Sequence, residues 1–218
     1  DGTLMNIGNR HRPHFEVDKD VTKIAAGPGV GLYVKRDGSL WRWKSNYYRA
    51  DQSDKKRLAS NVVEVATSGE HTVYIKKDGS LWGWGDNFNG ELGGKSHPYY
   101  VNEESAVKIV PKGVVHVSVS QGATVFVKDD GSLWGMGGGT DIRPKSSNWT
   151  RKARPVKLID SGIVRAYTNG RTTYAITASG DYWACGRSLV SGWTNEFVKW
   201  DDSFESIDFS IFSPRDPY

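Results

Sequence analysis

The stretch Asp78-Gly79-Ser80-Leu81-Trp82 decides the fold, because close copies of it recur along the whole chain. The copies begin at positions 1, 37, 78, 130 and 179, and the last one is degenerate and reads Ser-Gly-Asp-Tyr-Trp. Successive copies therefore lie 36 to 52 residues apart. Repeats of that length are typical of propellers, solenoids and other arrays of one supersecondary unit. In such folds the functional part is usually a surface made by loops.

Each copy of the motif predicts a β-hairpin. Apolar residues alternate before the Asp-Gly pair and again after it, and this arrangement favours a type I′ turn with positive φ at both central residues. In the third copy the arriving strand is expected at 73–76 and the departing strand at 81–84. The expected structural turn residues are Asp37, Gly38, Asp78, Gly79, Asp130 and Gly131.

Two further strands are expected in each unit. Runs of β-forming residues begin 15 residues before the motif in four copies, at positions 22, 63, 115 and 164. Weaker runs at 106–109 and 155–158 follow the hairpin and supply a fourth strand. The departing strands carry apolar residues on both faces, as expected for strands packed between two neighbouring blades. No long apolar stripe with a period of 3.6 residues is present, so we expect almost no helix.

The third unit carries the most informative pattern. Residues 67–93 combine the hairpin with the tail Gly-Asp-Asn at 85–87 and Gly-Glu-Leu-Gly at 90–93. This pattern resembles the repeat of the regulator of chromosome condensation (RCC1) family, and the other copies match it in the hairpin but lose the tail. The resemblance implies an all-β, RCC1-like β-propeller with a general habit of binding other proteins. It implies no catalytic residue.

Five units predict a five-bladed propeller that forms a single domain over residues 1–218, with blades centred on the motifs at 1, 37, 78, 130 and 179. The tail at 207–210, Ile-Asp-Phe-Ser, resembles Val-Glu-Val-Ala at 63–66. We therefore expect the N- and C-terminal segments to share one blade, with residues 1–8 pairing to 204–218, because closure removes exposed sheet edges. A fragment of a longer array stays open as the alternative.

The composition excludes several classes of protein. The net charge of +4 is mild, since 29 basic residues are interspersed with 25 acidic ones, and nucleic-acid binding is not expected. No apolar run reaches the 18 residues that a membrane span needs. The single Cys185 excludes an internal disulfide and is expected in the core. A soluble chain is predicted, for which a secreted or cell-surface location stays open.

No motif for catalysis, metal binding or cofactor binding is present. His11 and His14 lack a third metal ligand at motif spacing, and the acidic run at 86–91 lacks oxygen ligands at required positions of a calcium loop. His71 and His116 are expected to brace the blades. No nucleophile elbow, phosphate-binding loop or dinucleotide fingerprint occurs. We therefore expect a protein that is not an enzyme and needs no cofactor.

Candidate binding residues lie in four irregular insertions, at roughly 44–61, 86–113, 137–162 and 187–203. If all four follow the same strand of their units, they emerge on one face. Aromatic and Arg side chains in loops are the residues that carry binding hot spots. The candidates are Tyr47, Tyr48, Arg49, His97, Tyr99, Tyr100, Trp149, Arg151, Lys152, Trp193, Phe197 and Trp200.

Several functional hypotheses follow. The leading one is a non-enzymatic recognition or scaffold propeller that binds another protein through its loop-lined face. A carbohydrate-binding, lectin-like propeller is an alternative, because Tyr and Trp rings stack on sugars, although the loops do not repeat the polar residues that repeated glycan sites need. A repeat module of a larger secreted or surface protein is a further alternative. Guanine-nucleotide exchange, the activity of the RCC1 family's founding member, is not expected with five repeats and irregular loops.

Overall fold

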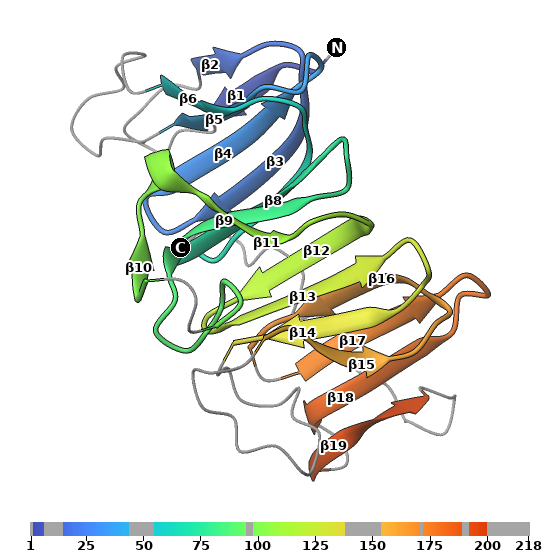
Figure 1. Cartoon of the computed structure of the whole chain (residues 1–218). Coiled ribbons are helices and arrows are strands. Elements are labelled where there is room, and N and C mark those ends of the chain that lie inside the picture. The colour runs from blue at the N-terminus through green and yellow to red at the C-terminus, as the bar shows by residue number, and fades with distance from the viewer. Residues whose placement is uncertain are drawn as a thin grey trace, which may run out of the picture.

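Antiparallel sheets that follow one another along the chain make up the computed structural model (Figure 1). The structure describes residues 2–6, 15–43, 55–94, 98–137, 154–170, 172–188 and 192–199. Within these ranges there are three four-stranded sheets, one five-stranded sheet and one two-stranded sheet. The same ranges contain no α-helix, and a single short 3-10 turn, η2, spans Glu103–Ser105. The prediction of an all-β propeller is thereby confirmed.

Each of the four larger sheets is one blade made of consecutive strands. The strands of the first blade are β3 (Val21–Gly27), β4 (Val30–Lys35), β5 (Leu40–Trp43) and β6 (Lys55–Ala59). Those of the second are β7 (Val62–Thr67), β8 (His71–Lys76), β9 (Leu81–Asp86), β10 (Tyr100–Val101) and β11 (Val107–Val110). In the second blade, both β10 and β11 pair with the outer edge of β9.

The third and fourth blades repeat this order. The strands of the third are β12 (Val114–Ser120), β13 (Ala123–Lys128), β14 (Leu133–Met136) and β15 (Val156–Ile159). Those of the fourth are β16 (Ile163–Thr168), β17 (Thr172–Thr177), β18 (Tyr182–Ser188) and β19 (Gly192–Lys199). The upstream strand, the hairpin and the weak fourth strand expected from the sequence all form, and the first strands of neighbouring blades pack against one another.

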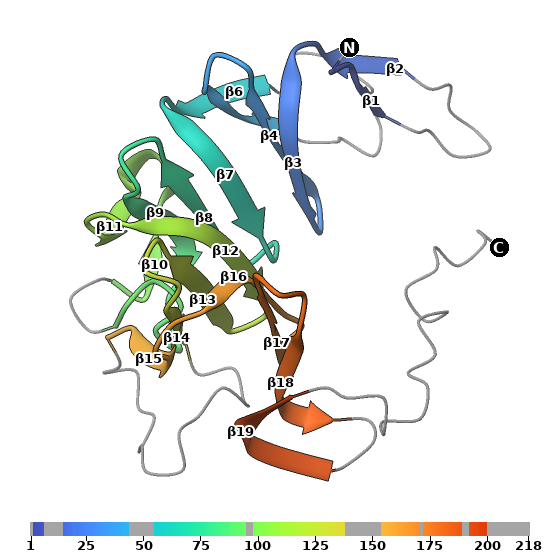
Figure 2. The same ribbon diagram turned by 90° about the vertical axis from the view of Figure 1, so that its right-hand side faces the viewer.

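The two-stranded sheet holds the third and fourth strand positions of a further blade. It pairs β1 (Leu4–Asn6), which begins within the first motif copy, with β2 (Phe15–Asp18). Val21 N donates to Gly2 O at 2.8 Å, the same contact that Val62 N makes to Gly38 O at 2.8 Å. In Figure 2 this sheet lies beside β3, at the end of the series opposite to β16–β19. The expected pairing of residues 1–8 with 204–218 lies outside the described residues.

The Asp-Gly turn differs from the predicted type I′ turn. Gly38, Gly79 and Gly131 have φ of 82°, 74° and 77°, but among the described non-glycine residues only Asp20 and Asn61 have a positive φ. In each turn the glycine N–H donates to the Lys carbonyl three residues back, and the Lys N–H donates to the Ser carbonyl four residues on. This pattern is a three-residue loop, a type I turn followed by a glycine bulge.

Side-chain hydrogen bonds explain why the turn takes this form. Asp78 Oδ1 accepts from Ser80 N and from Ser80 Oγ, and Ser80 Oγ accepts from Trp82 Nε1 at 2.8 Å. The chain repeats in the turns at 37–41 and 130–134. The bond from the Ser hydroxyl lowers the pKa of Asp78. An Asp that bonds residues ahead of it holds a local turn, so the motif needs Asp, Gly, Ser and Trp together.

The core lies between the blades. Leu40, Leu81 and Leu133, at the same motif position, are completely buried. Cys185 is buried as expected. A larger apolar cluster joins the first three blades, and a smaller one joins the third and fourth. Packing therefore runs continuously from blade to blade, as in repeat proteins that bury a core between neighbouring units.

Candidate interaction face

One end of the blades collects the longer connections. Because the strands of a blade alternate in direction, the ends of β5, β9, β14 and β18 share this end with the tight turns between first and second strands. We call it the insertion face. The Asp-Gly turns lie at the opposite end. The described strands therefore place the starts of the connections after β5, β9, β14 and β18 at one end of the blades.

The structure divides the predicted binding residues into three groups. Tyr99 directly precedes β10 and Tyr100 lies on it, and both are exposed. Phe197 lies on strand β19 and contacts the smaller apolar cluster, and Trp193 lies on the same strand. The others fall outside the described residues: Tyr47, Tyr48, Arg49, His97, Trp149, Arg151, Lys152 and Trp200.

The expected insertion at 187–203 is wrong in its extent. Residues 192–199 form β19, which pairs with β18 from Trp183 to Ser188. Pairing with β18, rather than a regular alternation in the sequence, makes this stretch an outer strand of the blade. The same holds in part for the other insertions, which contain β6, β11 and β15.

Three aromatic side chains in the segment after β9 are exposed, and two of them lie close together. Phe88, Tyr99 and Tyr100 are 69%, 56% and 58% exposed, and the rings of Phe88 and Tyr99 lie 5.7 Å apart. We call these three residues the aromatic patch. Phe88 is absent from the candidates read from the sequence, because it lies between the two parts of the family-like tail, at 85–87 and 90–93. A large apolar side chain between two Asn residues, Asn87 and Asn89, was the available signal.

A buried asparagine holds the base of this patch. Asn87 Nδ2 donates to Pro98 O at 2.9 Å, and Asn87 Oδ1 accepts from Leu92 N at 3.0 Å. Asn87 N donates to Tyr99 O at 2.7 Å. Asn87 and Leu92 are both completely buried. The two chain segments that carry Phe88 and Tyr99 are therefore tied to each other at one residue.

A second set of contacts ties the loop to the third blade. The buried Glu91 carboxylate accepts from Asn89 N at 2.9 Å and Asn89 Nδ2 at 2.8 Å. Glu91 O accepts from the hydroxyl of Thr124 on β13 at 2.9 Å. The Thr124 oxygen is then free to accept from His71 Nε2, which lies 2.9 Å away. Burial lowers the pKa of His71 to about 4, so the ring is neutral and braces the blades, as expected from the sequence.

An ion-pair cluster ties the far end of the insertion to the first blade. Glu103 in η2 accepts from Arg42 of β5 and lies 3.3 Å from Lys56 Nζ of β6. Lys56 also contacts Glu104. Surface ion pairs are individually weak, but a cluster that joins two blades restricts where the insertion can lie. The aromatic patch is therefore presented on a loop that is fixed to the first, second and third blades.

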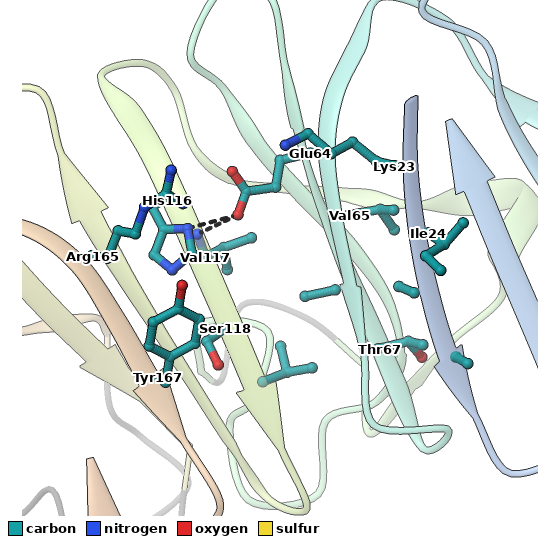
Figure 3. Close-up of a pocket in the computed structure, with 14 residues that line it drawn as sticks. Lys23, Ile24, Glu64, Val65, Thr67, His116, Val117, Ser118, Arg165 and Tyr167 are labelled. Carbon is teal, nitrogen blue, oxygen red and sulfur yellow. Dashed lines mark hydrogen bonds and ion pairs between the residues drawn. The ribbon is translucent and has the colours of Figure 1, made fainter. Parts of the chain in front are cut away.

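Apart from the aromatic patch, a concave site lies along the first strands of the blades (Figure 3). A pocket of about 330 Å³ is lined by residues of β3, β7, β12 and β16. Glu64 Oε1 lies 2.8 Å from His116 Nδ1, and His116 Nε2 lies 2.9 Å from Ala166 O. His116 thus joins the second, third and fourth blades, in keeping with the structural role expected for it.

The described part of the chain holds no group of three or more His, Cys, Asp or Glu side chains that could bind a metal ion. Nor does any described helix have the length and apolar character to cross a membrane. The arrangement that remains is a rigid, exposed aromatic surface.

Comparison with known proteins supports the fold. The family model of the regulator of chromosome condensation (RCC1) repeat matches residues 62–91 of the sequence. Human WBSCR16 superposes with a TM-score of 0.68 at 17% identity, covering 86% of this chain and 55% of that chain. Yeast RCC1 (Prp20), solved bound to Kap60, superposes with a TM-score of 0.69 at 16% identity, covering 87% of this chain and 51% of that chain.

A second structure of Prp20p from Saccharomyces cerevisiae, described with its binding properties to Gsp1p and histones, gives a TM-score of 0.65 at 16% identity, covering 87% of this chain and 53% of that chain. The chain spans about half the length of these solved structures. No curated protein matches it in sequence.

Proposed function

We propose that this chain, an RCC1-like β-propeller, is a non-enzymatic recognition domain that binds another protein through its insertion face. The observation that carries the proposal is the aromatic patch of Phe88, Tyr99 and Tyr100, which is exposed yet held by buried polar contacts. Exposed large apolar side chains that gather in one place mark interaction sites, and Tyr is enriched among binding hot spots.

The rigidity of the loop strengthens this reading. A loop that is already ordered before binding loses little conformational entropy when a partner docks, so more of the contact energy appears as affinity. Asn87 ties the two ends of the loop together, Glu91 O ties it to the third blade, and Glu103 ties it to the first.

The relatives of known structure agree with a binding role. Prp20 was solved bound to Kap60, and its binding to Gsp1p and histones has been described. These proteins are longer than this chain and share 16% identity with it, so their particular partners say nothing about the partner of this chain. What they support is protein recognition by a propeller of this architecture.

The test compares two triple variants of the whole chain. F88A/Y99A/Y100A removes the aromatic patch, and V63A/V115A/V164A removes three exposed apolar side chains from first strands near the Asp-Gly end of the blades. Immobilised wild type and both variants are used to capture partners, followed by direct binding of the purified partner. We expect the aromatic variant to lose a partner that the valine variant retains.

Two outcomes would contradict the proposal. One is a directly bound partner that the aromatic variant holds as tightly as the wild type. The other is a glycan-array signal that the aromatic variant loses while no protein partner depends on the patch, which would favour the carbohydrate-binding alternative. Unchanged circular dichroism and thermal unfolding of the variants serve as the folding control.

A further inference from the structure

Side chains from one equivalent position of four blades meet in the pocket along the first strands. We call this pocket of about 330 Å³ the inner pocket. Each first strand has a register shift near its start, and the residue that follows the shift is Lys23 on β3, Glu64 on β7, His116 on β12 and Arg165 on β16. Figure 3 shows these four side chains in a row across the inner strands.

The two middle side chains of this row satisfy each other. Glu64 Oε1 lies 2.8 Å from His116 Nδ1 and accepts from Val117 N at 3.3 Å. His116 Nε2 lies 2.9 Å from Ala166 O in the fourth blade. The Glu64 carboxylate is therefore held by the third blade, and none of the ion pairs among the described residues joins it to a cation at either end of the row.

The two outer side chains are cations without an acidic partner in the described part of the chain. Lys23 and Arg165 are both exposed, and neither forms an ion pair with a described residue. Arg42, Lys56 and Lys199, by contrast, all pair with carboxylates. The inner pocket thus carries uncompensated positive charge at its two ends.

Exposed apolar surface lies beside each of these cations. Ile24, next to Lys23, is 67% exposed, and Tyr167, two residues after Arg165, is 45% exposed. Both side chains line the inner pocket. The Tyr167 ring stands edge-on to the ring of His116, with the centroids 5.3 Å apart. A cation and an apolar side chain therefore occur together at each end of the pocket.

We propose that the inner pocket binds an acidic segment of another protein, with one carboxylate of the segment beside Lys23 and a second beside Arg165. Cations in a concave site attract carboxylates, because the low-dielectric walls focus their field. The Arg165 guanidinium suits a carboxylate particularly well, since it donates two parallel hydrogen bonds. Ile24 and Tyr167 receive apolar side chains of the same segment.

The extent of the pocket favours a protein segment over a free carboxylic acid. Its two cations lie on β3 and β16, and β7 and β12 lie between these strands. A small acid bound at one cation leaves the other cation and its apolar neighbour in water, whereas an extended segment reaches both ends. The site shares no residue with the aromatic patch, so the two surfaces are tested independently.

Fluorescence anisotropy of a labelled peptide rich in Glu, Leu and Tyr tests the proposal on the whole chain at low ionic strength. K23A/R165A removes both cations, and we expect it to weaken binding at least about tenfold. K108A/K157A removes the same charge from exposed lysines of β11 and β15, and should bind the peptide like the wild type. K23R/R165K keeps both charges and should retain most of the binding.

Further measurements locate the peptide and identify the source of its carboxylates. Hydrogen exchange of the wild type with saturating peptide should slow at 23–26 and 165–168, a readout that needs no variant. F88A/Y99A/Y100A should bind the peptide as the wild type does. Citrate, a free tricarboxylate, should displace the labelled peptide only at concentrations far above those of the unlabelled peptide.

Several results would overturn the proposal. The wild type could fail to bind the peptide, K23A/R165A could bind as tightly as K108A/K157A, or protection could fall outside both strand segments. Displacement by citrate at the concentrations needed of unlabelled peptide would assign the pocket to free acids instead. Loss of peptide binding in F88A/Y99A/Y100A would move the acidic segment to the insertion face, whereas failure of the inner pocket alone leaves the proposed role of the aromatic patch unchanged.

Discussion

The glycine of the Asp-Gly turn matters both for the shape of the turn and for the packing of the next blade. Its positive φ closes the bulge, and its missing side chain lets the next blade approach. A Cβ on Gly79 would lie 2.7 Å from Gly113 N, and one on Gly131 would lie 2.7 Å from Gly162 N. Gly79 O also accepts from Val114 N at 2.9 Å. The motif therefore specifies the contact between blades as well as the hairpin.

Two variants separate the cost of the backbone strain from the cost of the lost close approach. Gly180 has a φ of 86° with no atom within 4 Å of a Cβ, so G180A should cost only the backbone strain, about 1 kcal/mol. G79A has the same strain and also pushes the third blade away, so we expect it to lose at least about 1 kcal/mol more. Urea unfolding of both variants measures the difference, and equal losses would mean that the close approach is not a constraint.

His71 makes stability depend on pH. Its pKa is lowered by burial to about 4 in the folded chain, against about 6.5 when unfolded. Below pH 6.5 the unfolded chain binds a proton that the folded chain does not. The stability that the neutral ring provides is therefore complete above pH 6.5 and is lost as the pH falls to about 4, by about 3 kcal/mol in all.

The variant H71Q removes this titration. Urea unfolding at pH 4, 5, 6 and 7.5 should show a smaller loss of stability on acidification for H71Q than for the wild type, whatever the difference between them at pH 7.5. Carboxylates such as Asp18 titrate in both proteins and cancel in the comparison. Parallel pH curves for the two proteins would show that His71 does not set the slope.

At the scale of elements, the hairpins and first strands were predictable because their pattern is local. Asp-Gly between alternating apolar runs indicates a hairpin in any context. The outer strands were harder, since β19 at 192–199 has an irregular sequence and is defined by its pairing with β18. The turn type was also missed, because it depends on the bond between Asp78 and Ser80.

The hydrogen bonds of Asn87 hold the insertion after β9, which carries the aromatic patch. N87A removes the bonds to Pro98 O and from Leu92 N and leaves the N–H of the buried Leu92 unpaired, at about 1–3 kcal/mol. We expect faster amide exchange at Leu92 and weaker partner binding with the aromatic patch intact. Asn102, exposed and without a side-chain cap bond, gives the control N102A. Equal behaviour of N87A and N102A would show that the brace is unimportant.

At the scale of the whole molecule, the sequence predicts a propeller and the face that carries its insertions, but not which insertion residues share a surface. Tyr99 and Tyr100 were predicted from their loop position, and Phe88 was not. Asn87 brings Tyr99 next to Phe88, because its side-chain amide donates a hydrogen bond to the carbonyl of Pro98, eleven residues further along the chain. Such a contact depends on the folded loop and leaves no periodic signal in the sequence.

The most direct test of the proposed binding face is hydrogen exchange of the chain with and without its captured partner. We predict protection confined to the insertion face and centred on residues 87–106, with the Asp-Gly turns at 35–39, 76–80 and 128–132 unchanged. Protection of those turns, with residues 87–106 exchanging as fast as in the free protein, would contradict the account and place the recognition surface at the opposite end of the blades.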